Sequence, residues 1–315
     1  MPSLREIGEQ GLLKLLKPFC SDRMGDDGAV MGELAQGYEM VVTTDILIDG
    51  IHFSPQTTAP EDTGWRAAAA NLSDLAAMGA SPWGVTLALG LPADADINWI
   101  LGVYRGFTAC LKAYNTELVG GDTVRSLVKT LAVTAFGQVK SDQIIYRHTA
   151  QVGDLILITG EHGLSRAGLE ILVNPELAQN LSIDAIAKLH QAHQRPQPRL
   201  DILPLSYRVS GMDSSDGLAD AIAQICDASG VNAEIMQVPI PEEVKLVADQ
   251  VGVAAIDWVL YGGEDFELVL CLAPDHAEKL VKSIPTAKII GQIILKDQTQ
   301  ENSQRINLSK SFQHF

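Results

Sequence analysis

Six short acidic segments, each containing or following Gly, Ser, Thr or Asn, recur along this chain. They are 25–28, 43–45, 71–74, 120–122, 213–217 and 262–265. We expect most of them at the ends of strands and helices, where loops commonly carry binding and catalytic side chains. Because the segments are so far apart in sequence, any shared function depends on a fold that brings them together.

Hydrophobic patterning predicts a mixed α/β chain. Helices are expected over 3–17, 61–78, 98–114, 164–172, 183–193 and 217–228, and strands over 40–44, 84–89, 117–119, 130–139, 155–158, 209–212, 233–238, 266–272 and 288–293. A length of 315 residues suggests about two domains at roughly 150 residues each. The boundary is expected between 139 and 153, which gives domains 1–145 and 146–315.

Each acidic segment also has an ordinary structural interpretation. Asp26-Asp27-Gly28 is typical of a turn, and Asp216 is a plausible N-cap for the helix that follows it. Asp74 is equally compatible with a solvated helix position, and Gly262-Gly263 with a simple turn. The functional interpretation therefore depends on the number and similar chemistry of the segments.

Several carboxylates in one cleft would raise one another's pKa or bind cations. Oxygen donors of this kind suit Mg²⁺, and a phosphate group could approach them only through bridging metal. Gly120-Gly121 and the predicted strand-to-helix turn at 213–217 would add backbone N–H groups that attract phosphate. The pattern favours metal-assisted phosphoryl transfer, although the Walker A and protein-kinase motifs are absent.

The charge balance narrows the classes of partner. The chain has 23 Lys and Arg against 39 Asp and Glu, a formal net charge of −16, which argues against nucleic acid or an anionic membrane surface as partner. The N-terminal segment has no apolar signal region, and no apolar run approaches a membrane span. Cys20, Cys110, Cys226 and Cys271 form no CxxC pair. We therefore expect a cytoplasmic protein with reduced thiols.

Taken together, the motifs resemble the thiamine-monophosphate kinase family. The resemblance is carried, in the family's order, by 25–29, 43–45, 49–53, 71–80, 120–123, 213–218 and 262–266. The decapeptide 71–80 and the Gly-Gly-Glu-Asp-Phe segment 262–266 are highly specific. The chain departs from the family where Arg23-Met24 precede Gly25, and where Ser214 replaces the Leu of Asp-Leu-Ser-Asp-Gly. It also departs at the C-terminus, where the aromatic neighbourhood is reduced to 311–315.

The resemblance implies a fold shared with aminoimidazole ribonucleotide synthetase. That fold has an N-terminal α/β domain whose mixed sheet pairs with its twin in a homodimer, and a C-terminal α+β domain. Domain 1–145 would bind ATP and Mg²⁺ and dimerise, and domain 146–315 would complete the active site.

The resemblance also implies roles for individual residues. The Mg²⁺ ligands would be Asp26, Asp27, Thr43, Thr44, Asp45, Asp74, Asp122, Asp213 and Asp216. The nucleotide contacts would be Tyr104, Gly121, Asp122, Arg147 and Ser215. The thiamine-phosphate contacts would be His52, Glu264 and Phe312, and the catalytic group would be Asp45, Asp74, Asp122 and Arg147. Structural roles stay open for three of these residues: Arg147 as a surface residue beside a domain junction, His52 as a satisfied structural histidine and Tyr104 as a core residue.

The implied reaction is ATP-dependent phosphorylation of thiamine monophosphate to thiamine diphosphate, with several Mg²⁺ ions. Two alternatives are weighed against it. One is another ATP-using enzyme of the same superfold, resembling selenophosphate synthetase, a purine-pathway synthetase or the hydrogenase-maturation dehydratase. The other is a non-catalytic binder of divalent cations.

Overall fold

The computed structural model describes residues 4–21 and 31–296, apart from the side chains of residues 4, 5 and 7–10. Contacts between Cα atoms divide the chain into two compact units. Unit 1 comprises Met1–Leu75 and Ala80–Ser141, and unit 2 comprises Ala76–Gly79 and Asp142–Phe315. Each unit is built around its own β-sheet.

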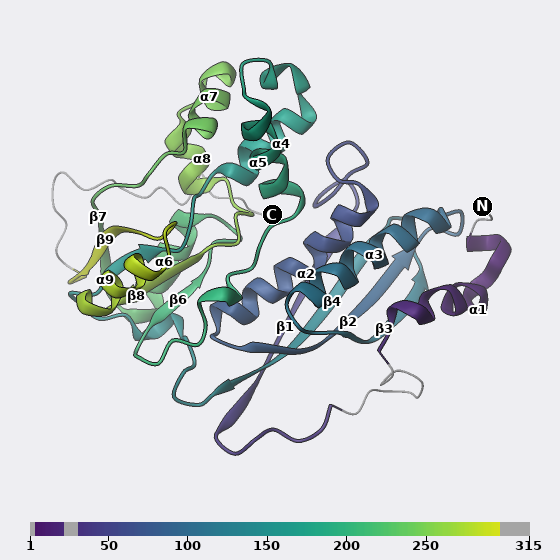
Figure 1. Cartoon of the computed structure of the whole chain (residues 1–315), viewed down its shortest axis with the longest axis horizontal. Coiled ribbons are helices and arrows are strands. Elements are labelled where there is room, and N and C mark those ends of the chain that lie inside the picture. The colour runs from purple at the N-terminus through teal and green to yellow at the C-terminus, as the bar shows by residue number, and fades with distance from the viewer. Residues whose placement is uncertain (1–3, 22–30, 297–315) are drawn as a thin grey trace. The chain divides into compact units, whose positions relative to one another are not determined.

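Unit 1 carries a four-stranded mixed sheet in the order β1-β4-β2-β3 (Figure 1). Its elements are α1 (Leu4–Leu16), the 3-10 turn η1 (Lys17–Phe19), β1 (Tyr38–Ile48), α2 (Pro60–Ala77), β2 (Ser81–Leu91), α3 (Ile97–Ala113), β3 (Leu118–Arg125) and β4 (Thr130–Lys140). The pairs β1–β4 and β2–β4 are antiparallel, and β2–β3 is parallel. The N-terminal α/β domain with a mixed sheet is therefore confirmed.

Helices α2 and α3 cover one face of this sheet (Figure 1). Every second strand residue points to this face, and many of those residues, such as Leu87 and Val133, are apolar and fully buried. The two helices pack backbone to backbone at glycines: a Cβ atom on Gly64 would lie 1.9 Å from the Val103 carbonyl oxygen. A side chain at this position would force the helices apart.

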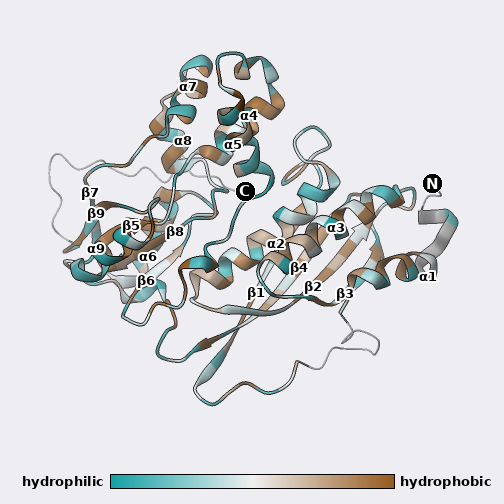
Figure 2. Cartoon of the chain, in the orientation of Figure 1, coloured by the Kyte–Doolittle hydropathy of each residue, from teal (hydrophilic) through white to brown (hydrophobic). Residues whose placement is uncertain are grey.

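Among the residues that the structure describes, the opposite face of the sheet is largely exposed. Its apolar side chains include Met40, Val42, Ile46 and Val124, each more than half exposed. The strand register places these residues in the rows that alternate with the buried ones. Hydrophobic residues run along these strands in Figure 2.

Unit 2 carries a five-stranded sheet in the order β6-β8-β5-β9-β7, in which every neighbouring pair is antiparallel. Its elements are η2 (Arg147–Thr149), β5 (Leu155–Ile158), α4 (Leu164–Val173), η3 (Pro175–Ala178), α5 (Ile183–Gln194), η4 (Leu200–Ile202), β6 (Ser210–Asp213), α6 (Leu218–Ser229), β7 (Asn232–Ile235), α7 (Glu242–Val251), α8 (Ala255–Tyr261), β8 (Leu268–Leu272), α9 (Pro274–Ser283) and β9 (Lys288–Ile294). The predicted α+β character of this half is confirmed.

Two apolar layers enclose this second sheet. Ile156 and Val269 face a cluster built with α4, α6, α7 and α8, whereas Leu157 and Leu268 face a cluster that includes α9. Because neighbouring strand residues enter opposite layers, both faces are buried. This explains why β8 reads as a continuous hydrophobic run.

The structure corrects several sequence expectations. The strand predicted over 40–44 is longer, Tyr38–Ile48, so segment 43–45 lies inside β1 and not at its end. The strand predicted over 117–119 continues to Arg125, so segment 120–122 lies inside β3 and not beyond its end. The strand predicted over 266–272 begins at Leu268, because Phe266 adopts a left-handed φ of 52°. The N-cap of α6 is Gly217, so Asp216 does not cap this helix. Within the part of the chain that the structure describes, no helix is long and apolar enough to cross a membrane.

Candidate active site

Three of the predicted ligands come together in unit 1 on the helix-covered side of the sheet. The Thr43 hydroxyl donates a hydrogen bond to the Asp74 carboxylate, which joins β1 to α2. Asp45 follows Thr43 by two residues and pairs with the buried Val133, so its side chain points to the same side. The middle of β1 and the C-terminal half of α2 therefore supply three oxygen-bearing side chains to one region.

Thr44 and Asp122 point to the other side of the same sheet. Thr44 pairs with Thr134, and its hydroxyl donates to the Val133 carbonyl at 2.8 Å. Asp122 pairs with Ala88 in the open rows, and its carboxylate accepts the Thr123 backbone N–H at 2.7 Å. The strand alternation thus separates the predicted unit 1 ligands into two sets, one on each face.

Gly121 has a structural requirement of its own. A Cβ atom there would lie 2.2 Å from the Leu87 carbonyl oxygen of the paired strand β2. Only glycine permits this close parallel pairing just after the irregularity between Val85 and Thr86. The proposed contact of Gly121 with nucleotide stays a prediction.

Two further predicted contacts in unit 1 have structural partners. Tyr104 on α3 is buried, its ring lies 5.7 Å from that of Phe19, and burial raises the pKa of its hydroxyl. The His52 Nδ1 atom accepts the Ile48 backbone N–H at 3.1 Å, so in the neutral ring Nε2 carries the proton. The buried Arg66 guanidinium approaches the His52 carbonyl at 3.5 Å and supports this turn from beneath.

The unit 2 candidates lie on two loops that hydrogen-bond to each other. β6 ends at the buried Asp213, whose carboxylate accepts the Ser215 hydroxyl at 3.1 Å. The Ser215 carbonyl in turn accepts the Glu264 backbone N–H at 2.7 Å. Asp216 is exposed beside them. The structure therefore brings together the metal-ligand candidates of the 213–217 turn and the substrate candidate Glu264.

Backbone strain marks the second of these loops. Glu264 and Phe266 have positive φ values of 57° and 52°, which are rare for residues other than glycine. Asp265 lies between them, and its carboxylate accepts the backbone N–H groups of Gly163 at 2.6 Å and Ser165 at 2.9 Å at the N-terminus of α4. Burial raises the pKa of Asp265 to about 7, against the lowering effect of these two donors. Strained residues that the surrounding structure fixes in this way are typical of functional loops.

Sequence reasoning missed the buried polar side chains beneath these loops. The Glu267 carboxylate accepts hydrogen bonds from the Thr159 hydroxyl and from Arg199, whose Nη1 lies 2.7 Å away. Arg199 also forms a two-point ion pair with Asp201. Asp265 could have been identified from the sequence, because it lies inside the 262–266 motif. No local sequence pattern indicated Thr159, Arg199 or Glu267.

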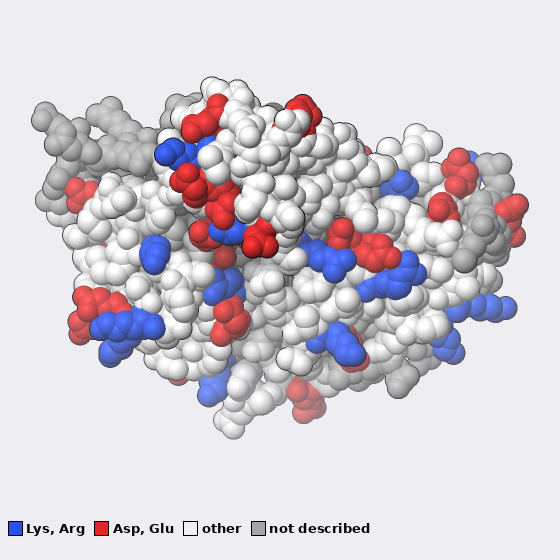
Figure 3. Space-filling model, turned by 45° about the horizontal axis from the view of Figure 1, so that its top comes forward, with Lys and Arg blue, Asp and Glu red and all other residues white. Residues whose placement is uncertain are grey.

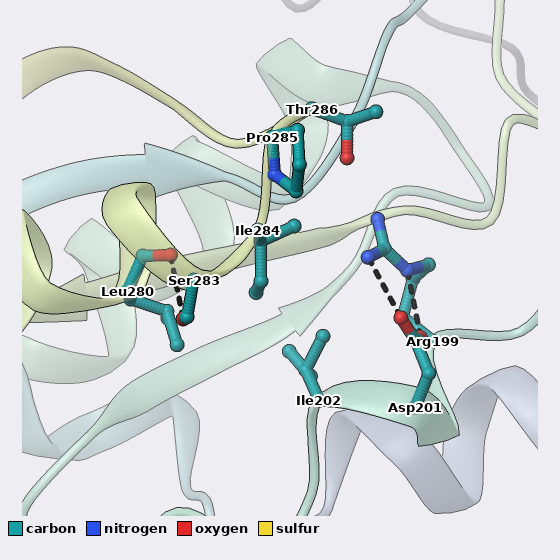
Figure 4. A pocket seen from close by; sticks show the side chains of 8 residues that line it. All are labelled: Arg199, Asp201, Ile202, Leu280, Ser283, Ile284, Pro285 and Thr286. Carbon is teal, nitrogen blue, oxygen red and sulfur yellow. Dashed lines mark hydrogen bonds and ion pairs between the residues drawn. The ribbon is translucent and has the colours of Figure 1, made fainter.

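Arg199 also lines a cavity of about 430 Å³ (Figure 4). Its lining residues are Arg199, Asp201, Ile202, Leu280, Ser283, Ile284, Pro285 and Thr286. The polar groups there bond to the protein itself: Ser283 donates to the Leu280 carbonyl and Thr286 to the Thr159 carbonyl. We therefore assign no substrate to this cavity.

Arg147 lies in η2 and is exposed. Its Nη1 atom donates to the Gln224 side chain on α6 at 2.6 Å. Its carbonyl accepts the hydroxyls of Ser210 and Ser229, which fix the backbone from which the guanidinium extends. The side chain is thus a positioned surface cation of unit 2.

The oxygen donors of Thr43, Asp45 and Asp74 are of the kind that binds Mg²⁺. Within residues 4–21 and 31–296, no three His, Cys, Asp or Glu side chains converge into a metal cluster. Mg²⁺ is usually held by one or two carboxylates together with water and substrate phosphates, a requirement that the Thr43, Asp45 and Asp74 oxygens match. Asp26, Asp27 and Phe312 fall outside the described residues.

On the face shown in Figure 3, acidic and basic side chains are interspersed.

Comparison with known proteins gives a consistent result over the whole chain. Residues 25–139 match the model of the AIR synthase related protein N-terminal domain, and residues 151–300 match that of the C-terminal domain. The thiamine-monophosphate kinase of Synechococcus elongatus is 51% identical over 99% of this chain and 98% of its own length. The corresponding Bacillus subtilis protein is 32% identical over 93% of each chain.

Solved structures agree with the sequence relatives. The thiamine-monophosphate kinase of Stenotrophomonas maltophilia superimposes with a TM-score of 0.77 at 34% identity, covering 89% of this chain and 90% of the other. AaThiL complexed with AMPPCP and TMP gives a TM-score of 0.76 at 28% identity over 100% and 99% of the two chains. The family expectation is confirmed: this chain belongs to the thiamine-monophosphate kinase family of AIR synthase related proteins.

Proposed function

We propose that this protein transfers the γ-phosphoryl group of ATP to thiamine monophosphate, forming thiamine diphosphate and ADP. The observation that carries the proposal is the 51% identity to a thiamine-monophosphate kinase along 99% of the chain. The structural relative complexed with AMPPCP, an ATP analogue, and TMP supports both substrate classes. The oxygen-rich loops and strands described above supply the chemistry that such a transfer needs.

The metal-binding part of the proposal assigns the ligands predicted from the sequence. The described ones are Thr43, Thr44, Asp45, Asp74 and Asp122 in unit 1 and Asp213 and Asp216 in unit 2, and Asp26 and Asp27 complete the predicted set. Mg²⁺, when bound, would neutralise phosphate charge and orient the phosphates. The contact between Thr43 and Asp74 would hold that carboxylate ready to bind, because the hydroxyl fixes one of its oxygens.

The chain's own residues would contribute positioning and charge. The acceptor is already an anionic phosphate oxygen, so the transfer hardly needs a general base. An in-line displacement would break the bond between the γ-phosphorus and the oxygen bridging to the β-phosphate, and form a bond to the acceptor oxygen. Arg147 would stabilise the charge on the transferring group, and Glu264 would face the cationic thiazolium ring.

We further propose a homodimer formed through the open face of the unit 1 sheet. Met40, Val42, Ile46 and Val124 are each more than half exposed on that face. Several exposed apolar side chains on one sheet face favour an interaction site there. In this proposal domain 1–145 binds ATP and Mg²⁺ and dimerises, domain 146–315 completes the active site, and the protein works in the cytoplasm.

The proposal is tested by measuring ADP release from ATP. Four reactions are compared: with and without thiamine monophosphate, each in Mg²⁺ and in EDTA. We expect ADP only when both the acceptor and Mg²⁺ are present. ADP release without acceptor would indicate another ATP-using enzyme of the superfold. No ADP in any reaction would indicate a non-catalytic cation binder.

A further inference from the structure

Ser214 is buried, unlike Ser215 and Asp216, which follow it in the chain. It lies between Asp213 and Ser215 in the turn after β6, yet it is almost completely buried. Its backbone N–H donates to the Glu267 carbonyl at 2.9 Å, and its hydroxyl lies 3.1 Å from the same oxygen. The turn is therefore held from inside by one residue while its neighbours carry the proposed ligands.

A buried histidine completes this arrangement. The Nε2 atom of His162 lies 3.0 Å from the Ser214 hydroxyl oxygen. The Glu267 carbonyl can only accept, so a hydroxyl that bonds to both neighbours must donate to Glu267 and accept from His162. This direction requires the proton of the neutral ring to sit on Nε2.

The surroundings of His162 agree with that protonation. Burial is the larger effect and lowers the pKa of His162 to about 4, whereas the Gly160 backbone acts to raise it, so the ring is neutral near pH 7. Within the described residues, Nδ1 makes no hydrogen bond of good geometry. An unpaired lone pair there costs less than an unpaired buried N–H, which again favours the proton on Nε2.

Glu267 gives the chain of hydrogen bonds a fixed end. Its carboxylate is held by the Thr159 hydroxyl and by Arg199. Its backbone directly precedes β8, which pairs with β6 in register from Asp213 opposite Leu268. The Glu267 carbonyl thus lies at the start of an interior strand, which makes it a reliable anchor for the turn.

We propose that His162, Ser214 and the Glu267 carbonyl form a directed hydrogen-bond chain that holds the 213–216 turn in the conformation that binds the Mg²⁺–nucleotide. His162 and Ser214 are positioning residues, since they touch the turn and not the substrates. The inference rests on the proposed function only for its kinetic consequence.

The kinetic test compares Ser214→Ala and His162→Leu with the wild type. Both substitutions remove the bond between His162 and the turn, and we expect each to raise the KM for ATP about tenfold, the equivalent of about 1.4 kcal/mol. The KM for thiamine monophosphate should change less than twofold. His162→Gln keeps an N–H donor and should restore most of the loss. The double variant should be no worse than either single variant, because both break the same chain.

A matched control separates positioning from general destabilisation. Thr63 is fully buried in α2, and its hydroxyl donates to the Ala59 carbonyl. Thr63→Val also removes one buried hydroxyl, and we expect a comparable drop in melting temperature with an unchanged KM for ATP. If Ser214→Ala and His162→Leu leave the KM for ATP within twofold of wild type, the proposal is overturned.

A second readout does not depend on activity. NMR of wild-type protein labelled with ¹⁵N at its seven histidines reports which ring nitrogen of each is protonated. We expect His162, assigned as the signal lost in His162→Gln, to carry its proton on Nε2 at pH 7. A proton on Nδ1 would overturn the proposal. A wild type that releases no ADP with thiamine monophosphate would instead reject the proposed function, while this result would still decide the hydrogen-bond chain.

Discussion

The two units present their candidate residues in different ways. Unit 1 carries Thr43, Asp45 and Asp122 in the middle of regular strands, where pairing and alternation fix the side chains. Unit 2 carries Asp213 at the very end of β6, where a turn begins, and Glu264 in a loop with left-handed residues, and side-chain and backbone hydrogen bonds fix both. The first arrangement derives its precision from the sheet, and the second from specific polar contacts beneath the loops. Substitutions should therefore act differently in the two units.

The largest effect is expected at Asp74 in unit 1. Asp74→Asn removes a carboxylate charge while an amide oxygen still accepts from Thr43, so the fold should persist. We expect turnover to fall about 10²–10³-fold at saturating Mg²⁺, the range for loss of a preorganised electrostatic group. Steady-state kinetics and thermal melting check both parts.

The control for this variant is Asp227→Asn, an exposed aspartate on α6. It makes the same chemical change away from the proposed ligands and should keep turnover within twofold of wild type. Wild-type turnover in Asp74→Asn would reject the proposed role of Asp74 as a Mg²⁺ ligand.

In unit 2 the matching substitution is Asp265→Asn, with an expected loss of about tenfold in kcat/KM. The amide can accept from one of the two N–H donors of α4 but presents its own N–H to the other. The strained backbone at Glu264 should therefore relax. The loss should appear mainly in the KM for thiamine monophosphate, because Glu264 is the proposed substrate contact. An unchanged KM for thiamine monophosphate would show that Asp265 does not position Glu264 for substrate binding.

Asp265 also predicts a pH dependence of stability. Its pKa is raised to about 7 in the fold from about 3.9 in the unfolded chain, so its protonation favours the folded state. This contribution is fully present below about pH 4 and is lost as the pH rises through 7. Urea unfolding should show that Asp265→Asn gains stability relative to wild type between pH 4 and pH 7. A constant difference across that range would contradict the raised pKa.

The open face of the unit 1 sheet predicts an effect on assembly. Val42→Glu places a charge among exposed apolar side chains, and burying it in a dimer would be unfavourable. Light scattering should show a dimer for wild type and a monomer for the variant, with the unit 1 fold retained. The control is Glu39→Gln. Glu39 is an exposed residue of β1 in the rows that alternate with the open face, and this variant should stay dimeric. A monomeric wild type would reject the dimer.

The smallest effect is expected at Tyr104. The ring is buried against Phe19, and Tyr104→Phe keeps that packing. If the residue acts mainly in the core, the KM for ATP should change less than twofold. A tenfold increase would instead support the nucleotide contact that the family resemblance implies.

Local patterns predicted most of the fold but not how it places side chains. The helix over 61–78 was predictable from its composition and from Gly79, which adopts a φ of 74° just beyond α2. The length of β3 was not, because Gly120-Gly121 is unfavourable in an isolated strand, and only pairing with β2 explains it. The left-handed φ of Phe266 likewise depends on the contacts of its loop.

The candidate site was predictable to a similar extent. Residue types and motif order identified the acidic groups, since their chemistry is local. Their division between the two faces of the unit 1 sheet depends on strand register, a long-range property. The bonds from Ser214 to His162 and Glu267 join residues about fifty positions apart, so no single segment encodes them.

The most direct test of the central claim is the identity and stoichiometry of the products. ³¹P NMR of wild-type protein with ATP, Mg²⁺ and thiamine monophosphate should show thiamine diphosphate and ADP appearing in equal amounts. Asp74→Asn should form both about 10²–10³-fold more slowly. Release of inorganic phosphate in place of thiamine diphosphate, or thiamine diphosphate formed undiminished by Asp74→Asn, would contradict the account.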